Sequence, residues 1–142
     1  MKVVILAGGL GTRLSEYTKL IPKPMVEIGN KPMLWHIMSH YAQYGYKEFI
    51  VALGYKGEVI KDFFLKYYTL NNDFTINLVE NQIEYINEKS QDWTISLVDT
   101  GVSSMTGGRI LRLKELIGDE DFMVTYGDAV SDVNIAELVA QY

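Results

Sequence analysis

A glycine-rich segment near the amino terminus is the part of the sequence best suited to hold a phosphate or a base. The segment reads Ala7-Gly8-Gly9-Leu10-Gly11-Thr12-Arg13-Leu14. Glycines let the backbone approach a ligand closely, and successive N–H groups can form an anion-binding nest. A dinucleotide fingerprint would need glycine where Leu14 stands, and a P-loop would end in Gly-Lys-Ser/Thr. The segment therefore matches neither motif, and the glycines alone leave two interpretations open: a loop that holds a phosphate or a base, and a plain strand-to-loop turn.

Two cations follow this segment at a spacing that suits phosphate chemistry. Arg13 is followed ten residues later by Lys23, which stands between Pro22 and Pro24. The prolines stiffen the backbone around the lysine. An arginine on the terminal phosphates and a lysine beside the reacting phosphorus would form an electrostatic clamp for nucleotidyl transfer. The alternative is a pair of solvated surface cations near a proline turn.

A carboxylate near the other end of the chain suits a metal ion. Asp128 follows the apolar run Phe122–Tyr126 and Gly127. Mg²⁺ prefers oxygen ligands and brings phosphates with it. The alternative, a turn aspartate that caps the next helix, suits Asp132 better. We therefore predict Asp128 as a metal ligand.

The pattern of apolar residues predicts the elements that position these groups. Lys2–Ala7 is rich in β-branched residues and predicts a buried strand, and residues 32–44 carry a helical apolar stripe. The other expected elements are strands at Glu48–Leu53, 74–79, 93–98 and Phe122–Tyr126, helices at 58–67, 109–116 and 134–142, and a hairpin or polar excursion at 81–91. Strands 74–79 and 93–98 alternate as half-buried strands do. The order of elements predicts an α/β fold with a mixed, mostly parallel sheet and flanking helices.

In such a fold, ligands bind outside the carboxyl ends of the strands. The glycine segment follows the first strand, and Gly127-Asp128 follows Phe122–Tyr126. Both are therefore expected at the same edge of the sheet. The strand before Asp128 is expected near the middle of a larger sheet, so residues 1–142 are interpreted as the nucleotide-binding part of one domain.

Composition excludes several classes of function. The chain has 142 residues, a formal charge of −5 and no cysteine. A mildly acidic surface argues against broad binding to nucleic acid or to anionic membranes. The lack of cysteine excludes disulfide scaffolds and thiol catalysis, and it is compatible with a reducing cytosol. No apolar run approaches the roughly 18 residues of a membrane span, and glycines rather than a cleavage site follow Met1–Ala7. We therefore expect a cytoplasmic protein.

The motifs together resemble the sugar-1-phosphate nucleotidylyltransferases, over essentially the whole chain. The resemblance is carried by residues 6–14, Pro22-Lys23-Pro24-Met25 and Gly127-Asp128. It is strongest to those members that use CTP and glucose 1-phosphate, through residues 24–29, 34–38, 54–57 and 98–101 and the run 103–109. It implies a Rossmann-like nucleotidyltransferase sheet. The implied reaction forms CDP-glucose and pyrophosphate by in-line attack on the α-phosphorus. The open alternatives are UTP or dTTP as substrate, or a non-catalytic nucleotide-binding assembly module.

The same resemblance implies a role for each candidate residue. Leu6, Ala7, Gly8 and Gly9 would contact the base, and Gly11, Thr12 and Arg13 the triphosphate. Lys23 would neutralise the α-phosphate and Asp128 would hold Mg²⁺. Ser104, Thr106 and Arg109 would close over the nucleotide, although residues 100–109 could instead form a flexible polar loop with a helix cap. Catalysis would rest on Arg13, Lys23 and Asp128.

The sequence departs from the family pattern in three respects. Ala129 stands where members often have glycine, and Ile21 where close relatives often carry lysine. Members also have a second half with another metal aspartate and the sugar pocket, so we expect this chain to be truncated before that half and to make little CDP-glucose alone. The resemblance implies supply of dideoxysugars for bacterial lipopolysaccharide O-antigen.

Histidines and aromatic residues have simpler interpretations. His36 and His40 have i, i+4 spacing, but no third ligand accompanies them, so we interpret them as part of the packing. The chain has ten tyrosines. Tyr41, Tyr44, Tyr46, Phe63, Phe64, Tyr67 and Tyr68 are expected in the core or at a subunit contact, and a homo-oligomer is therefore expected.

Overall fold

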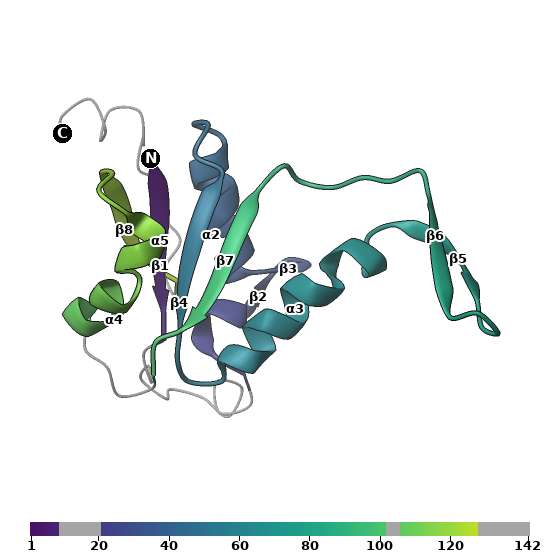
Figure 1. The fold of residues 1–142 in the computed structure, drawn as a ribbon, viewed down its shortest axis with the longest axis horizontal. Coiled ribbons are helices and arrows are strands. Elements are labelled where there is room, and N and C mark those ends of the chain that lie inside the picture. Colours follow the sequence, from purple (N-terminus) through teal and green to yellow (C-terminus); the bar gives the residue numbers. More distant parts are fainter. Residues whose placement is uncertain (9–20, 102–105, 128–142) are drawn as a thin grey trace.

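The computed structural model describes residues 1–8, 21–101 and 106–127 (Figure 1). Four parallel strands form the main sheet, in the order β7-β4-β1-β8. Their bounds are β1 Lys2–Ala7, β4 Glu48–Leu53, β7 Thr94–Asp99 and β8 Phe122–Tyr126. The prediction of a mostly parallel α/β sheet is confirmed.

Both faces of the central strands are buried, which explains their continuous apolar sequence. Val3, Ile5 and Ala7 of β1 join one core cluster with residues of α2 (Met33–Ala42) and α3 (Gly57–Leu70). Val4 and Leu6 join a second cluster, on the opposite face, which includes Leu113 and, from α5 (Lys114–Ile117), Ile117. The sheet therefore lies between two helical layers.

Two of the predicted helices are confirmed, with shifted ends. The stripe at 32–44 forms α2, and the stripe at 58–67 forms the longer α3. The helix expected at 109–116 is two short helices, α4 (Thr106–Arg112) and α5. The break falls at Leu113, which is fully buried. The helix expected at 134–142 lies outside the described residues.

Among the described residues 21–32, three short elements precede α2. A 3-10 helix, η1 (Lys23–Met25), is followed by β2 (Glu27–Ile28) and β3 (Lys31–Pro32). The last two strands pair antiparallel. Helix α2 begins directly after β3. The amide of Met33, its first residue, donates to the carbonyl of Val26 at 2.9 Å and so ties the start of the helix to this segment.

The prediction for residues 74–79 is correct in expecting a strand but wrong in expecting that strand to be half-buried. Strand β5 (Asp73–Asn77) is exposed along its whole length and pairs antiparallel with β6 (Gln82–Ile86). These two strands form a separate hairpin that projects from the body of the molecule (Figure 1). The hairpin expected as one alternative for residues 81–91 is not formed within those bounds, because Gln82–Ile86 is the second strand of a hairpin whose first strand is Asp73–Asn77.

Strand β8 lies at one edge of the four described strands. Val124 and Tyr126 of this strand are exposed. The expected position of β8 near the middle of a larger sheet stays a prediction, because residues 128–142 lie outside the described part of the chain.

Candidate functional site

The carboxyl ends of the strands meet at one edge of the sheet, as expected. Ala7 is in register with Leu53, Leu53 with Asp99, and Leu6 with Tyr126. The residues that follow these ends are Gly8, Gly54, Thr100 and Gly127. The structure thus brings the start of the glycine segment and the residue before Asp128 to the same edge.

Gly8 and Gly54 are in close backbone contact at this edge. A Cβ atom at Gly54 would lie 2.3 Å from the carbonyl oxygen of Gly8 and 2.8 Å from its Cα. Only glycine at position 54 permits this approach, so β4 helps to position the first residue of the glycine segment. The sequence interpretation treated Gly54 only as the end of a strand and missed this role.

The segment around Lys23 is fixed against the same edge. Pro24 is buried, and its Cγ would lie 3.4 Å from a Cβ atom at Gly127, which would also contact Ala7 at 3.3 Å. The amide of Gly127 donates to the carbonyl of Leu6 at 3.0 Å. Lys23 is half-buried within η1. Lys23 therefore belongs to a segment packed beside the start of the glycine segment and the end of β8.

Thr100 anchors the segment that leads from β7 to α4. Its side chain is fully buried, and both its amide and its hydroxyl donate to the carbonyl of Leu53 at 2.9 Å. The guanidinium of Arg112 in α4 donates to the carbonyl of Thr100. These bonds join the two ends of the segment that carries Ser104, Thr106 and Arg109.

Replacing Thr100 with valine is expected to lower the free energy of unfolding by about 1 kcal/mol, because the variant loses a buried hydrogen bond at nearly constant volume. Urea unfolding measures this difference. The matched control is Thr75→Val, at an exposed position of β5, which should leave the unfolding midpoint unchanged. Equal midpoints for Thr100→Val and the unmodified protein would contradict an anchoring role for the hydroxyl.

The structure describes only part of the predicted site. Leu6, Ala7, Gly8 and Lys23 lie at the carboxyl edge of the sheet or against it. Thr106 and Arg109 lie in α4, and their side chains are not described. The predicted residues outside the described ranges are Gly9, Gly11, Thr12, Arg13, Ser104 and Asp128.

Histidines of α2 have partners other than a metal. Nε2 of His36 forms a 2.7 Å hydrogen bond with the carbonyl of Ile28, and the ring of His40 packs edge-on against Tyr41 and Tyr44. Across residues 1–8, 21–101 and 106–127, no three His, Asp or Glu side chains are grouped so that they could hold a metal ion. None of the helices within these ranges is long and apolar enough to cross a membrane.

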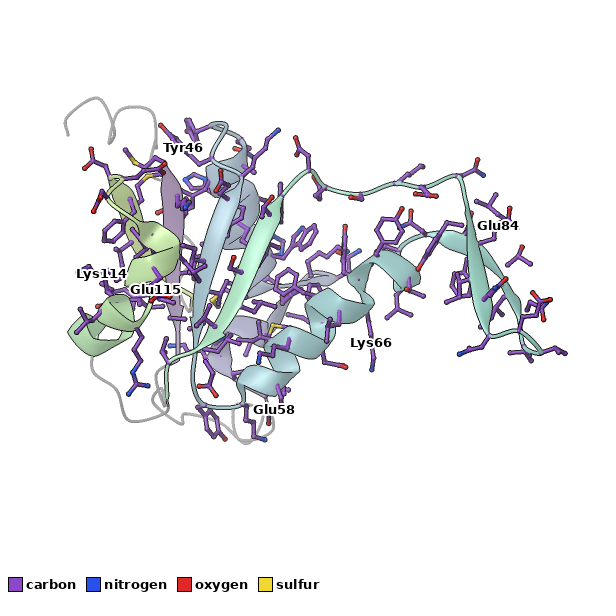
Figure 2. The ribbon with its side chains drawn as sticks, viewed as in Figure 1. Tyr46, Glu58, Lys66, Glu84, Lys114 and Glu115 are labelled. Carbon is purple, nitrogen blue, oxygen red and sulfur yellow. The ribbon has the colours of Figure 1, made fainter. Side chains whose placement is uncertain are left out.

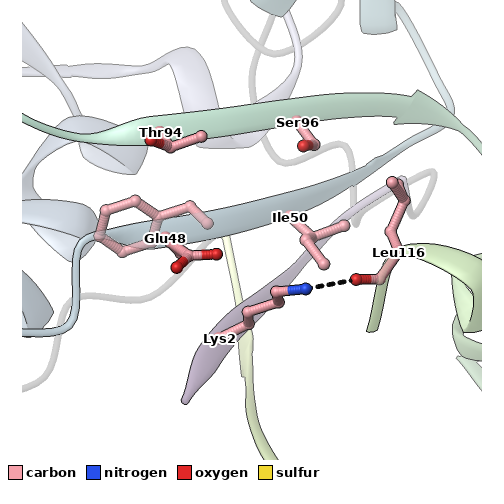
Figure 3. Close-up of a pocket in the computed structure, with 7 residues that line it drawn as sticks. Lys2, Glu48, Ile50, Thr94, Ser96 and Leu116 are labelled. Carbon is pink, nitrogen blue, oxygen red and sulfur yellow. Dashed lines mark hydrogen bonds between the residues drawn. The ribbon is translucent and has the colours of Figure 1, made fainter. Parts of the chain in front are cut away.

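Two cavities lie away from the carboxyl edge. One of about 90 Å³ lies at the amino ends of the strands, where the ammonium of Lys2 donates to the carbonyl of Leu116 at 2.7 Å (Figure 3). The other, of about 250 Å³, lies between α2, α3 and the chain that enters β7. Neither is lined by a predicted site residue.

The resolved shifts in pKa concern residues around the larger cavity and the chain beside it. Burial raises the pKa of Tyr67. The hydroxyl of Tyr68 donates to the carboxylate of Glu88, which raises the pKa of Tyr68. The ammonium of Lys47 donates to Asp92 at 2.7 Å and lowers the pKa of that carboxyl. Tyr67, Tyr68 and Lys47 are only half-buried and Asp92 is exposed, so solvent screens these interactions and their effect on stability is small.

Comparison with known proteins identifies close relatives. The chain is 54% identical to glucose-1-phosphate cytidylyltransferase of Salmonella typhimurium over an alignment of 136 residues. This alignment covers 95% of this chain and 53% of the relative. It is 47% identical to the probable glucose-1-phosphate cytidylyltransferase of Bacillus subtilis over an alignment of 142 residues. This alignment covers 100% of this chain and 56% of the relative. The chain thus spans about half the length of these relatives.

Solved structures share the fold. HddC from Yersinia pseudotuberculosis, complexed with GMP-PN, has a TM-score of 0.70 at 29% identity, over 99% of this chain and 53% of that one. A putative glucose-1-phosphate thymidylyltransferase from Bacillus anthracis has a TM-score of 0.71 at 19% identity, over 99% of this chain and 49% of that one, which shows the fold alone.

The family model described as nucleotidyl transferase matches residues 2–142. The match includes every strand of the main sheet and every segment that meets at its carboxyl edge. The chain therefore belongs to the nucleotidyl transferase family, and it corresponds to the amino-terminal half of its cytidylyltransferase relatives.

Proposed function

We propose that the protein carrying this chain transfers the cytidylyl group of CTP to glucose 1-phosphate, giving CDP-glucose and pyrophosphate. The observation that carries the proposal is the 54% identity to the Salmonella cytidylyltransferase. Relatives named for other nucleotides are less similar: a guanylyltransferase of Campylobacter jejuni at 34% and a uridylyltransferase of Mycoplasma pneumoniae at 36%. The similarity thus favours CTP over GTP and UTP.

The reaction needs no covalent intermediate with the protein. A phosphate oxygen of glucose 1-phosphate attacks the α-phosphorus of CTP in line and forms the new P–O bond. The bond from the α-phosphorus to the bridging oxygen breaks, and pyrophosphate leaves with that electron pair. Because the nucleophile is already ionised, the protein contributes positioning and stabilisation of charge.

The residues at the carboxyl edge suit these two tasks. Backbone groups of residues 6–9 would contact the base, and the close approach of Gly54 to Gly8 would hold the first residue of the glycine segment in place for this contact. Gly11, Thr12 and Arg13 would bind the β- and γ-phosphates. Lys23 would face the α-phosphate, and the packing of its neighbour Pro24 beside Gly127 at the carboxyl edge supports this role. Ser104, Thr106 and Arg109 would close the nucleotide site.

Asp128 would hold Mg²⁺. Gly127, the residue before it, is bonded to Leu6 at the carboxyl end of β1, so the chain approaches position 128 beside the proposed phosphate site. A carboxylate oxygen together with phosphate oxygens is a donor set that fits Mg²⁺. When bound, the ion would neutralise phosphate charge and orient the triphosphate.

A pyrophosphate-release assay tests the proposed function directly. The complete polypeptide is supplied with glucose 1-phosphate and, in parallel, CTP, UTP, dTTP or GTP. We expect the highest kcat/KM with CTP. A preference for UTP or dTTP would keep the chemistry and change the base, whereas binding of CTP without pyrophosphate release would favour a non-catalytic nucleotide-binding module.

We also propose the setting of this reaction. CTP and glucose 1-phosphate are cytoplasmic metabolites, which favours a cytoplasmic enzyme. CDP-glucose is an activated sugar, and the resemblance to the CTP-using members supports a role in dideoxysugar supply for lipopolysaccharide O-antigen. Loss of CDP-glucose from extracts of a deletion strain would support this assignment.

Replacing Arg13 with alanine should weaken CTP binding by more than tenfold and leave CMP binding nearly unchanged. The reason is that CMP lacks the β- and γ-phosphates that Arg13 would contact, and one charge-assisted hydrogen bond is worth about 1.5–3 kcal/mol. Isothermal titration with both nucleotides measures the difference. Equal weakening of CTP and CMP would refute the assignment of Arg13 to the terminal phosphates.

A further inference from the structure

Arg112 makes a hydrogen bond that joins α4 to the end of β7. Its guanidinium donates to the carbonyl oxygen of Thr100, which lies twelve residues earlier in the chain. Thr100 directly follows β7, and Arg112 is the last residue of α4. The bond therefore spans residues 101–109, here called the closing segment, which carries three of the residues assigned to the nucleotide: Ser104, Thr106 and Arg109.

The carbonyl that Arg112 holds belongs to a residue fixed to the main sheet. Thr100 is fully buried, and both its amide and its hydroxyl donate to the carbonyl of Leu53 at 2.9 Å. Leu53 is the last residue of β4 and precedes Gly54, whose backbone closely approaches that of Gly8. Arg112 thus ties α4 to the same backbone contacts that position the start of the glycine segment.

The chain turns directly after the residue that Arg112 holds. Gly101 adopts a φ of 88°, in the left-handed region that favours glycine. Its amide donates to Oδ1 of Asp99 at 2.9 Å, so the carboxylate closes a local turn. The closing segment begins at this turn, and the bond from Arg112 to Thr100 therefore restrains the point from which the segment departs.

The apolar contacts described for α4 lie at its carboxyl end. Leu113, directly after the helix, is fully buried in the second core cluster, and Ile110 packs against that cluster. By contrast, Leu111 is 69% exposed, and a Cβ atom at Gly108 would meet no atom within 4 Å. A helix packed at one end can still tilt about that end. The bond from Arg112 supplies a second attachment, which sets the direction of α4.

The side chain of Arg112 suits a directional contact rather than core packing. Arg112 is exposed, so its removal would leave no cavity in the core. A guanidinium is planar and stays charged, and its hydrogen bonds are roughly twice as strong as neutral ones. The partner is a backbone carbonyl, which no substitution at position 100 removes. The contact is therefore best tested from the side of Arg112.

We propose that Arg112 is a positioning residue for the nucleotide, which holds the closing segment in the arrangement that meets CTP. The inference rests on the proposed function, in which residues of this segment close over the nucleotide. Without the bond, CTP would have to order the segment when it binds, and that cost would be subtracted from the affinity. The cost is the same for the bound ground state and the transition state, so KM for CTP should rise while kcat stays nearly constant.

Steady-state kinetics of the complete polypeptide test this division. Arg112→Met keeps a long side chain and removes the donors, and it should raise KM for CTP by about tenfold, the cost of ordering a short segment. KM for glucose 1-phosphate and kcat should change little. Arg112→Lys keeps the charge and should recover part of the affinity. The matched control is Lys114→Met, which removes one positive charge from the neighbouring α5 and should leave KM for CTP unchanged (Figure 2).

The outcomes separate this inference from the proposed function. Urea unfolding first establishes that each variant is folded at the assay temperature. A folded Arg112→Met protein with a normal KM for CTP, or with a lowered kcat and a normal KM, would overturn the positioning role alone. An equal rise in KM for Lys114→Met would reduce the effect to general charge and would also overturn it. An unmodified protein that releases no pyrophosphate would refute the proposed function, and this role with it.

A double-variant cycle tests whether Arg112 acts through the closing segment. Arg109→Met removes a contact that the segment would make with the nucleotide. In that background, Arg112→Met should raise KM for CTP by much less than tenfold, because the segment then has less binding energy to lose. An equal factor in both backgrounds would mean that Arg112 acts independently of the segment, which would contradict the proposal.

Hydrogen exchange measures the attachment of α4 without turnover. In the absence of nucleotide, amides of Thr106–Arg112 should exchange faster in Arg112→Met than in the unmodified protein, because one end of the helix has lost its second attachment. Saturating CTP should remove most of this difference, since the nucleotide then orders the segment. Equal exchange in the free proteins, or a difference that CTP leaves unchanged, would overturn the proposal.

Discussion

Replacing Lys23 with alanine is expected to lower kcat by about 10²–10³-fold, with a smaller effect on KM. In the proposed reaction, Lys23 faces the α-phosphorus, where negative charge grows as the new bond forms. Removal of this ammonium costs more in the transition state than in the ground state, so kcat should respond more than binding does. Steady-state kinetics with CTP and glucose 1-phosphate separate the two effects.

The backbone around Lys23 is held by groups other than its side chain, so the substitution should remove the ammonium without disturbing the fold. Pro22 and Pro24 are buried on either side of it, and the amide of Met25 donates to the carbonyl of Pro22 at 2.9 Å. The backbone of this segment should therefore survive the substitution. Lys23→Arg keeps the charge and should recover part of the rate. The matched control is Lys66→Ala, an exposed lysine of α3 paired with Asp62, which should leave kcat unchanged.

A Lys23→Ala variant with a normal kcat would make Lys23 a surface cation, the alternative that the sequence left open. A variant with a normal kcat and a much larger KM would assign Lys23 to ground-state binding alone. Both outcomes would contradict the proposed role at the α-phosphorus, although neither would change the membership of the family.

The main sheet could be predicted because its strands are buried on both faces. Lys2–Ala7 and Glu48–Leu53 read as continuous apolar runs, which is typical of the centre of a parallel sheet. Their order along the chain, with a helical stripe between them, then determines that their carboxyl ends lie at one edge. The position of Gly8 near Gly127 follows from that rule, and the structure confirms it.

The setting of β5 could not be predicted because alternation reports only that one face is apolar. Phe74 and Ile76 alternate with polar residues as in a strand at the surface of a core. Which layer covers that face depends on partners distant in sequence or in another molecule. In the structure the strand pairs with Gln82–Ile86, and its apolar face stays exposed.

The candidate site was predicted in outline, but its backbone contacts were not. The edge at which Gly8 and Gly127 meet follows from the strand order. The approach of Gly54 to Gly8 depends on the register and twist of two strands, which a single sequence does not determine. The available signal was a glycine directly after the strand Glu48–Leu53. The roles of Arg13 and Asp128 stay predictions, because both lie outside the described residues.

Replacing Gly54 with alanine is expected to weaken CTP binding by more than tenfold and to destabilise the fold by about 1–3 kcal/mol. The added Cβ would lie 2.3 Å from the carbonyl oxygen and 2.9 Å from the carbonyl carbon of Gly8. These are backbone atoms, and they cannot move aside as the end of a flexible side chain does. Relief therefore requires a shift of β4 or of the first residue of the glycine segment.

Calorimetric titration with CTP and urea unfolding measure the two effects on the same Gly54→Ala protein. Gly108→Ala is the steric control for stability, because a Cβ there would meet no atom within 4 Å and alanine is favoured over glycine inside a helix. Its free energy of unfolding should be equal or slightly higher. If Gly54→Ala binds CTP normally while it is destabilised, the contact serves packing alone. Normal binding and normal stability together would mean that Gly8 and Gly54 are not held as closely as the structure places them.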